Sequence, residues 1–281
     1  MIVKTRRKKI VFIIVMLIGF FTWQNDAITV NERVIKNEKV PEAFDGYKIV
    51  QISDLHNKEF GDKQSKLLAK IKRIQPDIIV VTGDLIDSKT TNIDVALDLM
   101  KGASEMAPTY YVSGNHEAWS GVYDSLKHKL EETDVIVLED SKVEVSKENS
   151  SIELIGLSDI AFANLNSSTS SGVEYTKDIV SKLIDTTNTF RILLSHRPEL
   201  FHVYSASEVD LVFSGHAHGG QFRLPFIGGV VAPDQGIFPE FTEGIHMKNN
   251  TAMIVSRGLG NSIIPIRIFN RPELVVVTLA K

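Results

Sequence analysis

The stretch Ile78-Ile79-Val80-Val81-Thr82-Gly83-Asp84 (residues 78–84) decides the fold. Its apolar and β-branched run is typical of a strand, and the Gly-Asp pair that follows indicates a turn. In an α/β sheet such a turn lies at the carboxyl end of a strand, where ligand-bearing loops gather. The same pattern occurs earlier, where Ile49-Val50-Gln51-Ile52-Ser53 precedes Asp54. We therefore expect an α/β domain whose polar residues meet at one edge of a sheet.

Five short polar clusters close such apolar runs in a fixed order along the chain. They supply two carboxylates, one amide and four histidines as metal ligands, with one histidine to spare. This donor set suits two divalent cations. The clusters are Asp54-Leu55-His56, Gly83-Asp84, Gly114-Asn115-His116, His196 and Gly215-His216-Ala217-His218.

The residue types follow from phosphoryl-transfer chemistry. Two metals about 3.5 to 4 Å apart can hold both the attacking and the leaving oxygen of a displacement. Such a pair needs a bridging carboxylate, and Asp84 is the natural candidate. Two divalent cations bring four positive charges, whereas Asp54, Asp84 and a hydroxide remove three. With an amide at Asn115 and neutral histidines, the site stays about one unit positive and attracts an anionic phosphodiester.

The five clusters in this order resemble the calcineurin-like metallophosphoesterase superfamily, from about Ile49 to Gly220. The resemblance implies a four-layer αββα sandwich of two mixed sheets, with a dinuclear metal site at one edge. It also implies hydrolysis by attack of a metal-bridging hydroxide. Oxygen and imidazole ligands suit Mn, Fe or Zn alike.

The resemblance also implies a role for each site residue. His116 would face the phosphate as an acid or electrostatic stabiliser rather than as a ligand. One metal would be surrounded by Asp54, His56, Asp84 and His218. The other would be surrounded by Asp84, Asn115, His196 and His216.

Every cluster also has an ordinary structural interpretation. All five would have to be accidental together, in one order and at strand ends, so we favour the metal site. The alternatives are helix caps at Asp54 and Asp84, a turn at Gly114-Asn115, a helix start at His196, and strand alternation at His216 and His218.

The other titratable residues near the clusters are predicted to be ordinary. Glu117 and Asp87 could orient a histidine ring, but we expect surface carboxylates. His128, His202 and His246 lie outside the clusters and are expected to be solvated or packed.

Two further features indicate which branch of the superfamily the chain resembles. Protein phosphatases of this superfamily continue Gly-Asp into Asp-Arg-Gly, whereas this chain continues Gly83-Asp84 with Leu85-Ile86-Asp87-Ser88. The phosphate-clamping arginine is missing, which favours a phosphodiesterase or pyrophosphohydrolase. Gly219-Gly220-Gln221 and Ser256-Arg257-Gly258-Leu259-Gly260 resemble the membrane-associated bacterial branch, which includes UDP-diacylglucosamine pyrophosphohydrolase-like and exported cell-wall phosphodiesterase proteins. Arg257 would contact a substrate phosphate or cap a strand end.

The segment after His218 is rich in glycine, proline and bulky apolar residues, from Gly219 to Phe241. Beside a metal site, such a loop could receive a lipid or a sugar-lipid, or could touch the membrane surface. We favour the simpler interpretation, a hairpin whose apolar groups pack under the sheet.

The N-terminus predicts a membrane segment. Five basic residues among positions 4–9 precede an apolar run from Ile10 to Phe21. This is the pattern of a signal peptide or an uncleaved signal-anchor, and a twin-arginine export signal is an alternative. No clean cleavage site precedes Ala27, so we favour an anchor over residues 1–27 and a catalytic domain over residues 28–281. The positive-inside rule then predicts an extracytoplasmic domain at the cell membrane.

Composition supports one catalytic domain. The chain has 281 residues, a net charge of -4 and no basic run beyond the N-terminus, which argues against nucleic acid as a partner. Cysteine is absent, so thiolate metal sites and disulfides are excluded.

The apolar periodicity predicts alternating strands and helices. We expect a first strand over 28–35 and helices over 65–74, 94–101 and 120–131. Strands over 135–138, 142–145 and 152–157 are assigned to a second sheet, and 166–172 is read as a loop.

These observations favour a membrane-anchored two-metal phosphodiesterase acting on a small or lipid-linked phosphodiester or pyrophosphate. A phosphomonoesterase or nucleotide hydrolase with the same site is the main alternative. A non-catalytic binding module is disfavoured, because all seven expected ligands and His116 are present.

Overall fold

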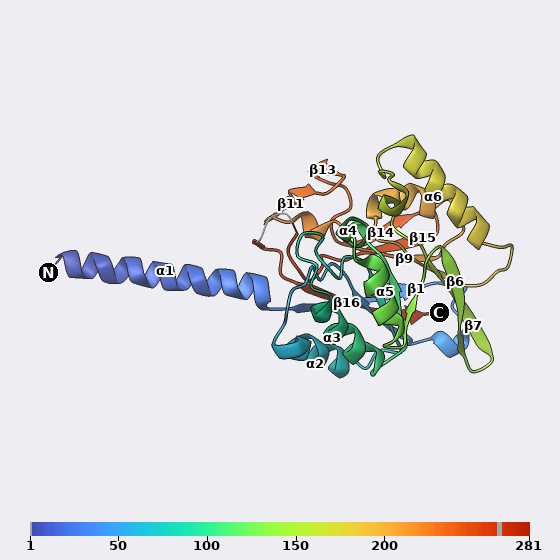
Figure 1. Ribbon diagram of the computed structural model, residues 1–281, viewed down its shortest axis with the longest axis horizontal. Coiled ribbons are helices and arrows are strands. Elements are labelled where there is room, and N and C mark those ends of the chain that lie inside the picture. Colours follow the sequence, from blue (N-terminus) through green and yellow to red (C-terminus); the bar gives the residue numbers. More distant parts are fainter. Residues whose placement is uncertain (1, 263–265) are drawn as a thin grey trace.

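Two six-stranded mixed sheets form the centre of the domain (Figure 1). The computed structural model describes residues 2–262 and 266–281, and only the backbone of residues 2–6. The first sheet contains, in spatial order, β1 (Thr29–Lys36), β16 (Glu273–Ala280), β2 (Lys48–Ile52), β3 (Ile78–Thr82), β4 (Thr109–Val112) and β5 (Val135–Val137). The second contains β14 (Gly244–Lys248), β15 (Thr251–Val255), β9 (Leu211–Ser214), β8 (Arg191–Leu194), β7 (Ser150–Gly156) and β6 (Ser141–Lys147).

The two sheets pack face to face around a shared apolar core. Ile49 of β2 and Ile78 of β3 point into this core, where they meet Leu154 of β7 and Leu194 of β8. The alternate residues of the same strands, such as Ile79, point to the opposite face. Because both faces are buried, β2 and β3 are made mainly of apolar residues instead of alternating apolar and polar ones.

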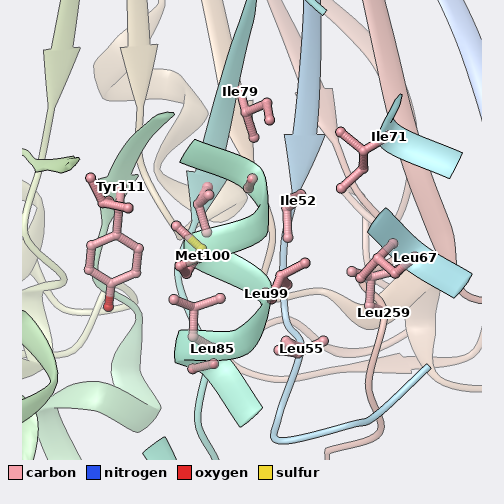
Figure 2. Packing of buried hydrophobic residues seen from close by; sticks show 14 of the residues in the cluster. Ile52, Leu55, Leu67, Ile71, Ile79, Leu85, Leu99, Met100, Tyr111 and Leu259 are labelled. Carbon is pink, nitrogen blue, oxygen red and sulfur yellow. The ribbon is translucent and has the colours of Figure 1, made fainter. Parts of the chain in front are cut away.

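Helices cover the outer face of each sheet. Against the first sheet lie α2 (Ser65–Ile74), α3 (Ile93–Ser104) and α5 (Tyr123–Glu131), and Figure 2 shows Leu99 and Met100 of α3 among Ile52, Ile79 and Leu85. Against the second sheet lie α6 (Ser170–Leu183) and α7 (Phe201–Tyr204), which bury Val180 and Phe201 on the strands. The four-layer αββα sandwich is therefore confirmed.

Three predicted elements differ from the structure. The helix expected over 120–131 is two helices, α4 (Asn115–Ser120) and α5, because Gly121 at φ 70° ends the first. The strand β5 belongs to the first sheet, not the second, because it lies parallel to β4 after the α5 crossover. The loop expected over 166–172 ends at Thr169, whose hydroxyl caps α6.

The segment after His218 forms two short hairpins, β10 (Arg223–Leu224) with β11 (Gly228–Gly229), and β12 (Val231–Ala232) with β13 (Gly236–Ile237). Ala232 of β12 packs into the core, but the large apolar residues of the hairpins do not pack under the sheet as expected. Phe226 is fully exposed, and Ile237 and Phe238 are 73% and 64% exposed. A two-residue strand buries little backbone, so the tips of both hairpins remain in solvent.

One long helix, α1 (Ile2–Asp26), projects from the domain (Figure 1). Residues Arg7–Asp26 form a 20-residue stretch of mean hydropathy 1.3 that is almost entirely exposed. By length and composition this helix can cross a membrane. Only two residues separate it from β1. Its last turns contact the domain, where the Phe20 ring lies 5.9 Å from Phe269 and Arg271 lies over Trp23.

Candidate metal centre

The seven expected ligands meet where strands of both sheets end. The first sheet contributes residues after β2, β3 and β4, and the second contributes residues after β8 and β9. All seven side chains are buried. They are Asp54, His56, Asp84 and Asn115 from the first sheet, and His196, His216 and His218 from the second.

Five of these seven residues have left-handed backbone conformations, with φ between 46° and 63°. Non-glycine residues seldom adopt this conformation, and it concentrates at functional sites. Neighbouring glycines allow the tight turns. A Cβ on Gly83, at φ 82°, would lie 2.6 Å from the backbone nitrogen of Gly114 and 2.8 Å from Nδ1 of His196. The five residues are Asp54, His56, Asp84, His216 and His218.

One group of donor atoms comes from Asp54, His56, Asp84 and His218, which lie within 4.8 Å of one another. Nε2 of His56 is 3.1 Å from Nε2 of His218. His218 Nε2 is 3.4 Å from Oδ1 of Asp54. His56 Nε2 is 3.5 Å from Oδ2 of Asp84.

A second group shares Asp84 with the first. Nε2 of His196 lies 3.2 Å from Oδ2 of Asp84 and 3.1 Å from Oδ1 of Asn115. It also lies 3.1 Å from Nδ1 of His216. The Oδ2 atom of Asp84 therefore stands between the two groups, while Oδ1 accepts a hydrogen bond from the backbone of His116.

The hydrogen bonds around the second group leave only acceptors facing one another. His196 donates from Nδ1 to the carbonyl oxygen of Thr82 at 2.7 Å, so in the neutral ring Nε2 carries a lone pair. Nε2 of His216 lies 3.2 Å from Oδ2 of Asp234, which leaves Nδ1 of His216 as an acceptor in the same way. Acceptors that converge without a donor need a cation between them. The residues present therefore fit a metal pair.

The charges of the group favour a cation as well. Burial opposes ionisation of Asp84, but His196 and His56 hold its pKa well below the usual range. Burial also lowers the pKa of His196, yet the Asp84 carboxylate outweighs it and raises that pKa to about 10. In the absence of metal, a proton on His196 would therefore take the place of a cation beside the Asp84 carboxylate.

Glu117 is buried, so its assignment as a surface carboxylate was wrong. Its carboxylate accepts hydrogen bonds from the backbone N–H groups of Asp84 and Gly114, both at 2.7 Å, and of Ile86 at 3.2 Å. Burial and the nearby Asp84 raise its pKa to about 7. Glu117 is the third residue after the N-cap Gly114, where a glutamate that accepts from the N-cap backbone forms one half of a capping box, and this position is the sequence signal for its role. Glu117 therefore connects the Gly83-Asp84 turn to the Gly114-Asn115 turn by hydrogen bonds.

An ion-pair network behind His216, with Arg197 and Asp159 buried and Asp234 partly exposed, was not predicted. Arg197 binds Asp159 at 2.8 Å and Asp234 at 2.5 Å. Asp234 in turn receives the His216 hydrogen bond. The position of Arg197 directly after His196 offered a signal, whereas Asp234 lies in an irregular hairpin and offered none.

His116 lies outside both groups, at the wall of the site. Its Nδ1 accepts a hydrogen bond from the backbone of Ser88 at 3.0 Å. Burial lowers its pKa, which favours the neutral ring. Asp87 lies 3.5 Å from the same ring and 3.8 Å from Nδ1 of His56. It therefore contacts two site histidines, contrary to the simple surface role expected.

A groove of about 510 Å³ opens over the two groups. His116 and the exposed Trp119 line it together, with ring centroids 5.7 Å apart. Pro233 and Asp234 of the second hairpin and Lys89 also line it. The groove is large enough for a phosphate ester with an organic substituent.

The remaining conspicuous residues lie elsewhere. Arg257 pairs with Glu243 and Glu273 at 3.2 and 3.5 Å and does not line the groove. Of its two predicted roles, these contacts fit a residue that caps the end of a strand. Gly258 after it packs on Asp54, and a Cβ there would lie 2.7 Å from that of Asp54. His128, His202 and His246 lie outside both ligand groups.

Fold and site define a metallophosphoesterase. Residues 47–220 match the family described as calcineurin-like phosphoesterase, and the chain belongs to this family. Membership makes it a phosphoric ester hydrolase. It is 32% identical over 259 residues to the uncharacterized metallophosphoesterase YkuE of Bacillus subtilis (90% of this chain, 85% of the relative).

Two other relatives carry more descriptive names. The phosphodiesterase YaeI of Escherichia coli is 26% identical over 238 residues, which are 83% of this chain and 82% of the relative. A transmembrane protein with metallophosphoesterase domain from Danio rerio is 26% identical over 251 residues, 86% of this chain and 55% of the relative.

Proposed function

We propose that this chain is a membrane-anchored, two-metal phosphodiesterase of the cell envelope, which hydrolyses a phosphodiester or pyrophosphate bond. The observation that carries the proposal is the place of Asp84 Oδ2 between two groups of acceptors, directly below a groove lined by His116. In hydrolysis, water adds across a phosphorus–oxygen bond. Phosphorus gains the oxygen of the water, and the leaving oxygen takes a proton.

The ligand roles follow the two groups. Asp54, His56 and His218 would hold one metal, Asn115, His196 and His216 the other, and Asp84 both. When bound, two divalent cations such as Mn, Fe or Zn supply Lewis-acid activation of water and of the phosphoryl oxygens. The chain itself fixes the ligands, through Thr82 and Asp234 on the histidines and Glu117 on the Asp84 turn.

His116 would supply the proton or the hydrogen bond. Since Nδ1 accepts from Ser88, the proton of the neutral ring lies on Nε2. A group of this kind can donate to a phosphoryl or leaving oxygen in the transition state.

The residues around the groove favour a phosphodiester, which has two substituents on phosphorus, over a monoester. Trp119, Pro233 and Lys89 are among the residues that line the groove. A doubly charged monoester is normally clamped by arginine, and the arginine found in protein phosphatases of this superfamily is missing after Asp87. The name of the relative YaeI points in the same direction.

The apolar helix supports a membrane location. Basic residues precede it, and it leads directly into the catalytic domain, so the domain would lie on the extracytoplasmic side. Protease added to wall-stripped cells should digest the domain while a cytoplasmic marker survives. Protection until the membrane is permeabilised would reverse this topology.

The enzymatic test compares a diester with a monoester. Full-length protein in detergent, supplied with Mn²⁺ or Zn²⁺, should hydrolyse bis(p-nitrophenyl) phosphate with kcat/KM at least about tenfold above that for p-nitrophenyl phosphate, a gap of about 1.4 kcal/mol. Asp54→Asn is the inactive control. A preference for the monoester would favour a phosphomonoesterase with the same site.

A further inference from the structure

An exposed apolar surface lies beside the site and is not used by the chemistry above. It consists of Leu224, Phe226, Ile227, Phe238 and Phe269, all of which are exposed. Three of them lie on the hairpin β10–β11, Phe238 directly follows β13, and Phe269 lies on the segment before β16. So many exposed large apolar groups on neighbouring loops are uncommon unless something covers them. We call these five residues the apolar rim.

The apolar rim is physically continuous with α1. Phe269 touches Phe20 near the end of the helix. The residue before it, Ile268, pairs with Phe222 in a β-bridge and accepts a hydrogen bond from the backbone of Arg223 at 3.1 Å. The hairpin that carries Phe226 therefore rests on the segment that contacts the helix.

The end of α1 is held firmly against the domain. The side-chain oxygen of Asn25 accepts a hydrogen bond from the backbone of Arg267 at 2.9 Å, and Arg271 binds the carbonyl of Ala27 at 2.9 Å. Lys58 pairs with Asp26 at 3.4 Å. With two residues between α1 and β1, the domain cannot drift far from the helix end.

The direction of the helix places the rim toward a bilayer. Figure 1 shows β11 and β13 on the side of the domain from which α1 leaves. A bilayer spanned by α1 would lie across that side. Trp23 at the end of the helix is suited to the interface, where aromatic residues gather.

The rim also borders the groove. In the hairpin β12–β13, Asp234 at the turn lines the groove, while Phe238, just beyond the second strand, is exposed on the rim. An amphipathic molecule lying in the bilayer below the rim would therefore need only its phosphate to reach the groove.

We propose that the apolar rim docks on the bilayer spanned by α1, and that the enzyme takes its substrate from that bilayer as a phosphate ester carrying a lipid tail. The substrate part of this inference rests on the proposed function. The docking part does not.

Docking is tested with single-cysteine variants, which the cysteine-free chain makes specific. Full-length Phe226→Cys and Phe238→Cys, labelled with an NBD fluorophore, are reconstituted in phosphatidylglycerol–phosphatidylcholine bilayers containing brominated lipid. Asn149→Cys is the matched control, because Asn149 is an exposed turn residue between β6 and β7, at the end of the domain away from α1 (Figure 1).

The expected result is strong quenching and a blue shift at positions 226 and 238, with neither at 149. Quenching at 226 and 238 no greater than at 149 would overturn the docking, and a rim covered by a protein partner would give that result.

Substrate origin is tested with a double variant, Phe226→Ser with Ile227→Ser. Its kcat/KM should fall about tenfold or more on a phospholipid with a p-nitrophenyl head group in the same bilayer, because two apolar side chains that would insert into the bilayer are lost. Turnover of soluble bis(p-nitrophenyl) phosphate should stay within about twofold, which also shows that the variant is folded. An equal fall on both substrates, or none on the lipid, would overturn the lipid source. A wild-type protein that cleaves neither substrate would instead refute the proposed function, and the quenching result would stand by itself.

Discussion

Nδ1 of His116 accepts a hydrogen bond from the backbone N–H of Ser88 at 3.0 Å. This contact fixes the tautomer of the ring, with the proton on Nε2, and ties His116 to the loop that follows Asp84. Burial lowers the pKa of the same ring, so the neutral donor form prevails near neutral pH. The neutral ring is therefore arranged to donate a hydrogen bond from Nε2, while its backbone N–H donates to Oδ1 of Asp84.

His116→Ala should retain both metals and lose about 10² to 10⁴ in kcat, the usual contribution of a positioned acid or base. Metal content by elemental analysis and diester turnover are measured on the same sample. His128→Ala, on the exposed face of α5, is the control and should change neither. Metal loss as large as that in His216→Ala would mean that His116 is a ligand.

Asp84→Asn should lower the occupancy of both metal sites, because Oδ2 of Asp84 lies 3.5 Å from His56 and 3.2 Å from His196. The wild-type chain, purified without chelator and supplied with metal, should approach two ions. The variant should fall toward zero at the same metal concentration. Loss of a single ion would contradict a shared ligand.

Asp234→Asn should weaken one site only. The Asp234 carboxylate faces Nε2 of His216, whose other nitrogen belongs to the second group. Loss of such an orienting partner typically costs about 10- to 100-fold in metal affinity. Titration with Mn²⁺, followed by electron paramagnetic resonance, should show one weakened and one unchanged site. Equal weakening of both would assign Asp234 a general structural role.

Glu117→Gln should destabilise the fold around the site. The carboxylate accepts three backbone hydrogen bonds in the interior, and the amide would turn an NH₂ group toward one or more of those donors. We expect a loss of about 1 to 3 kcal/mol, the cost of leaving a buried donor unpaired. Urea unfolding measures it, with the exposed Glu174→Gln as control. A variant as stable as the control would show that the three bonds are replaced.

Chelation should lower the melting temperature of the holo-protein. The buried carboxylates of Asp54 and Asp84 and the lone pairs around them face one another once the cations are removed. A metal held at about 100 times its Kd stabilises the native state by about 2.7 kcal/mol. Calorimetry with and without EDTA measures the difference, and it should disappear in Asp84→Asn.

The site was largely readable from the sequence because its residues follow apolar runs directly. Strand ends of one sheet meet at one edge, so Asp54, Asp84 and Asn115 could be expected to converge. Arg197 and Asp234 could not be paired in the same way, since the contact joins residues 37 positions apart through an irregular hairpin. Nothing periodic marks a residue in such a loop.

Two errors have a shared cause. The strand β5 was assigned to the wrong sheet, and the apolar hairpins were expected to be covered. In both cases the local pattern was read correctly as strand or hairpin. The partner of each element, however, depends on chain crossings and on the short length of β10 to β13, which hydrophobic patterning does not encode.

The place of β16 in the first sheet has a consequence for how the chain is made. This last strand lies between β1 and β2, parallel to one and antiparallel to the other. The first sheet therefore cannot be completed until residues 273–280 have left the ribosome. Contacts of such long sequence separation form slowly. The first sheet of the nascent chain must remain incomplete until β16 has been made, and deletion of residues 273–281 would leave β1 without a neighbour.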